Sequence, residues 1–87
     1  MSFSAGQVEE VGNFLQSYMK KKGIRSLSAD EAAELLADNN ILPNNIGPKQ
    51  GFNFRQMLRD GRDNKIHLVK GAHQYEPHTR WTINLIK

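Results

Sequence analysis

Apolar residues recur at three- and four-residue steps near the start of the chain, which is the spacing of one face of an amphipathic helix. The apolar positions of this stretch are Val8, Val11, Phe14, Leu15 and Tyr18. Ser4 and Gln7 have the spacing of a capping box, and Gly23 follows three lysines as a C-terminal stop. The pattern predicts a helix over residues 5–22.

A second helical stretch follows after a short gap. Ser28 and Glu31 have the S-x-x-E spacing of a capping box at its start, and two asparagines at 39 and 40 mark its end. Its apolar face carries the small and branched residues Ala32, Ala33, Leu35 and Leu36. We expect a helix over residues 29–39, whose alanines allow another helix to approach closely.

A third helix is predicted within residues 52–62, FNFRQMLRDGR, and its start has two interpretations. If Pro48 is the first helical residue, Phe52 projects away from the apolar side of the helix and is exposed. If Asn53 is the cap, an N-x-x-Q box forms with Gln56, and Phe52 staples onto Met57. We prefer the second start, with Gly61 as the stop, which gives a helix over residues 53–61. Its inner face is then Phe54, Met57 and Leu58, and its outer face is Arg55, Gln56 and Arg59.

Beyond Gly61 the pattern changes to alternation, which indicates strands over residues 65–70 and 80–86. Ile66 and Leu68 are expected inside on the first strand. Trp81, Ile83 and Leu85 are expected inside on the second. Because the residues from 71 to 79 between them are polar and include a proline, the simplest arrangement is an antiparallel hairpin with a long tip. The predicted fold is α+β: one domain over residues 1–87, with three helices followed by a two-stranded hairpin, to which Ser26 and Leu27 can pair briefly.

Charge is unevenly distributed along the 87 residues. The net charge is +3, but residues 1–43 hold four cations and six anions, whereas residues 44–87 hold eight cations and three anions. A polyanion would therefore bind the C-terminal half. No apolar run is long enough to cross a bilayer, the N-terminus lacks the order of a signal peptide, and cysteine is absent. We expect a cytoplasmic protein without membrane contact, nucleoid-associated if bacterial.

The sequence carries none of the motifs that mark common catalytic sites, such as a Walker A loop, a dinucleotide-binding glycine motif, H-E-x-x-H or G-x-S-x-G. His67, His73 and His78 are the metal candidates, and Glu76 is the one carboxylate near them in sequence. Zinc needs further ligands in fixed geometry. We therefore predict a protein that is not an enzyme, with no cofactor and no metal.

The order of the predicted elements resembles that of the winged helix-turn-helix family over nearly the whole chain. Three stretches carry the resemblance: Ala32-Ala33-Glu34-Leu35-Leu36, Asn53-Phe54-Arg55-Gln56-Met57-Leu58-Arg59 and Trp81-Thr82-Ile83. The segment from 39 to 52 is longer than the usual turn of that family. The resemblance implies that the third helix enters the major groove of DNA and that the hairpin, or wing, contacts the adjacent backbone or minor groove.

The resemblance together with side-chain chemistry yields the expected contacts. Arginine and glutamine suit base edges, and the flanking cations and asparagine suit phosphates. The expected DNA-binding residues are Lys49, Asn53, Arg55, Gln56, Arg59, Arg62, Lys65, Lys70, Tyr75 and Arg80. The predicted partner is a nucleic acid, with double-stranded DNA first. The alternatives are a winged-helix module that binds protein and a domain that binds RNA or single strands. With so few cations, a homodimer or a larger protein partner is also an expectation.

Overall fold

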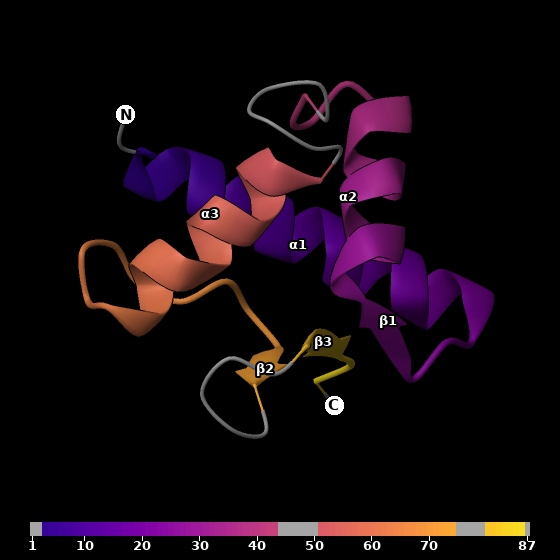
Figure 1. Cartoon of the computed structure of the whole chain (residues 1–87). Helices are drawn as coiled ribbons and strands as arrows, with labels where there is room; N and C mark the ends of the chain where they lie inside the picture. The colour runs from indigo at the N-terminus through magenta and orange to yellow at the C-terminus, as the bar shows by residue number, and fades with distance from the viewer. Residues whose placement is uncertain (1–2, 44–50, 75–79, 87) are drawn as a thin grey trace.

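A computed structural model describes residues 3–43, 51–74 and 80–86 of the chain. Its elements are α1 (Ala5–Lys22), β1 (Ser26–Ser28), α2 (Ala29–Asp38), α3 (Phe52–Arg62), β2 (Ala72–Gln74) and β3 (Trp81–Asn84). Figure 1 shows the three helices together above the small sheet, with β1 at the foot of α2 and β2 below α3. The prediction of a small α+β fold is confirmed.

The first two helices begin where their capping boxes predict. The Ser4 hydroxyl accepts the Gln7 amide at 3.1 Å, and the Gln7 side chain accepts the Ser4 amide at 2.9 Å. Ser28 and Glu31 make the same reciprocal pair, with both bonds at 3.1 Å. Both boxes connect residues three apart, so their formation depends on local sequence. α1 ends at Gly23 in the left-handed conformation, as predicted, and α2 ends one residue before the predicted position.

The predicted start of the third helix is wrong. Its cap is Gly51, at φ 83°, which makes no side-chain cap bond, and Asn53 already lies inside α3. Asn53 is 7% exposed, and its amide nitrogen donates to the Pro43 carbonyl at 3.2 Å. The Asn53–Gln56 box therefore does not form, because the Asn53 side chain is used to join α3 to the chain that follows α2. Phe52 lies in the first helical turn and is half-buried.

The predicted stop at Gly61 is also wrong, since α3 continues to Arg62 and Asp63 is its C-cap. Gly61 is buried, and a Cβ atom at this position would lie 2.9 Å from the Leu68 Cα. Glycine is needed here because the backbone of the following loop passes directly over the helix.

The first predicted strand, over residues 65–70, does not form. The strand that pairs with β3 begins later, at Ala72, after Gly71 turns the chain at φ 84°. The inward and outward positions differ accordingly, because Leu68 is 42% exposed whereas Val69 is 1% exposed. The close contact with Gly61 holds this segment as a loop against α3, so tertiary packing overrides the alternating pattern.

The sheet has three antiparallel strands in the order β1-β3-β2, where a two-stranded hairpin was predicted. Leu27 and Ala72 both pair with Ile83, one from each side. These three residues share one face of the sheet, and Leu27 and Ile83 are buried. The brief pairing expected for Ser26 and Leu27 is thus present as β1, and it places the N-terminus of α2 beside the hairpin.

The core lies between the helices and this face of the sheet. The predicted inward residues Phe54, Met57, Leu58, Trp81 and Ile83 are all buried in it. Across the described residues, no helix is long and apolar enough to span a bilayer.

Candidate nucleic-acid interface

Four arginines line a pocket of about 590 Å³ where α2, α3 and the hairpin meet. We call it the arginine pocket. Its lining residues are Ser28, Ala29, Asp30, Arg55, Arg59, Arg62, Gln74, Arg80 and Trp81. Four guanidiniums and one carboxylate face this space, and the N-terminal end of α2 adds the positive end of a helix dipole. The pocket is therefore suited to an anion.

Three of the arginines lie on one side of α3 because of their spacing. Arg55, Arg59 and Arg62 are four and three residues apart, so they follow one another along the same helical face. Phe54, Met57 and Leu58 hold the adjacent apolar face in the core with exposures of 1% or less. The apolar anchor thus fixes the direction of the arginine face.

Arg55 joins α3 to the N-terminus of α2. Its Nη1 atom lies 2.8 Å from Oδ1 of Asp30, and the two side chains are 27% and 83% exposed. The guanidinium also covers the helix cap, since a Cβ atom on Gly51 would lie 2.8 Å from the Arg55 Nη1. Arg55 therefore has a structural role at the start of α3 as well as a place in the pocket wall.

Arg59 is held by a chain of side-chain bonds along α3. Its Nη2 atom donates to Oε1 of Gln56 at 2.9 Å, and the Gln56 amide nitrogen donates to Oδ1 of Asp60 at 2.8 Å. Asp60 is 5% exposed, and the Arg59 guanidinium carbon lies 5.2 Å from the centre of the Phe52 ring. The Phe52 ring packs against the face of the Arg59 guanidinium, and the Gln56 amide accepts a hydrogen bond from its edge. Together the two contacts fix the orientation of Arg59.

The other two arginines are Arg62, at the C-terminal end of α3, and Arg80, directly before β3. Arg62 lies 3.2 Å from Asp63 through Nε and reaches Gln74 at 3.5 Å through Nη1. Arg80 is exposed, and no ion pair links it to another residue of the described ranges. Gln74, which Arg62 contacts, pairs with Trp81 across the hairpin. Because Arg80 is the residue before Trp81, this register brings it beside the arginine face of α3.

The structure brings together four of the residues expected from the sequence and separates the others. Arg55, Arg59, Arg62 and Arg80 line the pocket. Gln56 does not line it, and both polar ends of its amide are engaged by Arg59 and Asp60.

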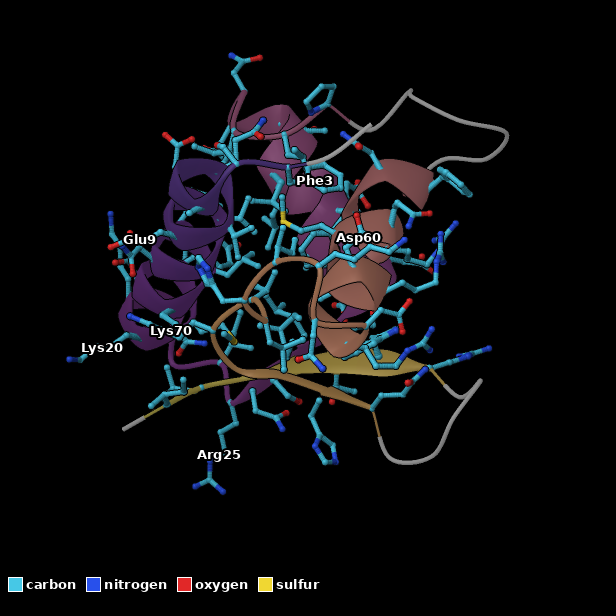
Figure 2. The ribbon with its side chains drawn as sticks, turned by 90° about the vertical axis from the view of Figure 1, so that its left-hand side faces the viewer. Phe3, Glu9, Lys20, Arg25, Asp60 and Lys70 are labelled. Atoms are coloured by element: carbon cyan, nitrogen blue, oxygen red, sulfur yellow. The ribbon has the colours of Figure 1, made fainter. Side chains whose placement is uncertain are left out.

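Three further expected residues lie away from the pocket. Asn53 is buried, and Lys65 is exposed in the turn after α3. Lys70 lies at the α1 side of the molecule, away from α3 (Figure 2), where its Nζ atom donates to Asn13 at 3.1 Å. The expected contacts Lys49 and Tyr75 lie outside the described residues.

Sequence reasoning missed Asp30 and Gln74 as pocket residues. Gln74 could have been found from the hairpin, had the strand been placed at residues 72–74, because alternation sets it on the face of Trp81. Asp30 carries no such signal, since its contact with Arg55 spans 25 positions of the chain. In the described ranges, no group of three or more potential ligands could hold a metal ion.

No family model, no curated protein and no solved structure matches this chain. Support for a function therefore comes from the geometry of the arginine pocket.

Proposed function

We propose that this protein binds double-stranded DNA through the arginine pocket, as a small regulator or accessory module. The observation that carries the proposal is the convergence of Arg55, Arg59 and Arg62 from α3 and Arg80 from the position before β3 on one pocket. Arginine forks match phosphate oxygens in bidentate geometry, and phosphate contacts supply most of the affinity of DNA-binding proteins.

The arrangement of elements supports a winged-helix mode of binding. The pairing expected of Ser26 and Leu27 with the hairpin is present as β1, a strand between the first two helices that joins β3. In this mode α3 lies along the major groove, while Arg80, which precedes β3 at the loop end of the hairpin, contacts the neighbouring phosphates. Gln56 holds Arg59 in position instead of reading a base, because its amide is already bonded at both ends.

The test is a fluorescence anisotropy titration with random-sequence duplex across a series of salt concentrations. If about four phosphates are neutralised, log K falls with log salt at a slope of about −4. Arg59→Ala, Arg62→Ala and Arg80→Ala should each weaken binding and make the slope shallower by about one.

Arg25→Ala is the matched control, because Arg25 is exposed and is no part of the pocket lining. Figure 2 shows its side chain extending outward from the body of the molecule. The control should keep the parent's slope. Absence of salt-dependent binding by the parent, or an equal loss in Arg25→Ala, contradicts the proposal. Tighter binding to a single strand or to RNA than to duplex would favour those ligands instead.

A further inference from the structure

A second hollow, with the opposite charge, lies between the end of α1 and the outer side of α2. It measures about 230 Å³ and is lined by Tyr18, Ile24, Leu27, Glu31, Glu34, Leu35 and Asp38. We call it the acidic groove. Its floor is apolar or aromatic, its rim carries three carboxylates, and it shares no lining residue with the arginine pocket.

The positions of two carboxylates on α2 lower the stability of this helix. Glu34 and Asp38 are four residues apart and both exposed, which is the spacing at which like charges destabilise a helix. Asp38 is the last residue of α2, and the final turn holds no basic residue, so its charge meets the negative end of the helix dipole. A cation nearby would remove both penalties.

The described structure shows no ion pair that would relieve these penalties. Neither Glu34 nor Asp38 takes part in an ion pair within residues 3–43, 51–74 and 80–86. Glu31 differs, because its carboxylate accepts the Ser28 amide in the capping box. Two carboxylates outside the ion pairs of the described residues therefore line the groove with Leu35 and Ile24, which are half-buried apolar side chains.

We propose that the acidic groove binds a basic amphipathic helix of a partner protein. One apolar side chain of the partner would enter the hollow, which measures about 230 Å³. Lysines or arginines on either side of that anchor would pair with Glu34 and Asp38. Helix-in-groove recognition commonly combines an apolar anchor with complementary charge at the rim. The carboxylates repel nucleic acid, so the groove stays available when a polyanion fills the arginine pocket.

The probe is a synthetic helical peptide of leucine and lysine, with leucines at three- and four-residue steps, titrated into the ¹⁵N-labelled protein. We expect amide shifts centred on Ile24, Leu35 and Asp38. A peptide with glutamate at every lysine position should produce none. Shifts that centre on the arginine pocket, or equal binding of the acidic peptide, overturn the proposal.

The double variant Glu34→Gln with Asp38→Asn keeps side-chain size and removes both charges. Its affinity for the basic peptide should fall about fivefold, the loss expected for two exposed ion pairs. Glu9→Gln with Glu10→Gln is the matched control, since both residues are exposed on α1 outside the groove, and it should bind as the parent does. Equal affinity of the two double variants refutes the charge pairing. This proposal does not depend on DNA binding, so the peptide titration and the DNA titration test the two proposals independently.

Discussion

Gln16 is expected to set the position of the hairpin relative to the helices. Its amide nitrogen donates to the carbonyls of Lys70 and Asn84 at 3.2 and 2.9 Å, and its carbonyl oxygen accepts the Ile86 amide at 2.8 Å. One half-buried side chain of α1 thus holds the chain before β2 and the chain after β3. Gln16→Ala removes all three bonds.

The expected loss of stability follows from these bonds. At a net contribution of about 1 kcal/mol each, three bonds give about 3 kcal/mol, and partial access of water to the freed groups reduces this to about 2 kcal/mol. For a domain of this size, that loss lowers the melting temperature by about 8–16 °C. Alanine is the better helix former, so helix propensity does not add to the loss.

Thermal unfolding followed by circular dichroism measures the effect. Ser17→Ala, at the next and exposed position of α1, is the control and should unfold close to the parent. Gln16→Glu keeps the size of the side chain but turns a carboxylate oxygen toward two carbonyls, so it should destabilise at least as much as alanine. A decrease of less than about 2 °C in Gln16→Ala would refute the clamp, because it corresponds to under ~0.5 kcal/mol.

Three further substitutions test local features of the fold by thermal or denaturant unfolding. Ser28→Ala should cost about 1 kcal/mol through loss of the α2 capping box, and an unchanged midpoint would contradict that role. Gly61→Ala should destabilise although helix propensity favours alanine by about 1 kcal/mol, because its Cβ would lie 2.9 Å from the Leu68 Cα; a more stable variant would disprove the close approach. Asp38→Lys should stabilise by about 0.3–1 kcal/mol by reversing the charge at the C-terminal end of α2, and a less stable variant would contradict the dipole argument.

Elements specified by neighbouring residues were predicted well. The capping boxes at Ser4 and Ser28 act over three residues, and both form. The helical period placed Phe54, Met57 and Leu58 in the core. These features could be predicted because each depends on contacts within about one turn of helix or on the side of an element that is apolar.

Predictions failed where a residue had two uses that local sequence could not separate. Asparagine is a common N-cap residue, but the Asn53 side chain donates to the Pro43 carbonyl, ten positions away. Glycine is common at the end of a helix, but Gly61 lies inside α3 and leaves room for the backbone at Leu68. Residues 65–70 alternate as a strand does, yet packing against α3 keeps them in a loop.

The candidate interface divides in the same way. The sequence by itself determined that Arg55 and Arg59 share the outer side of a helix, with Arg62 flanking it, because that follows from the 3.6-residue period and the apolar residues on the inner side. Only the tertiary structure decided that Asp30 and Arg80 join them while Lys70 turns to α1. Contacts between residues so far apart in sequence depend on how the elements pack. They leave no periodic pattern in the sequence from which they could be predicted.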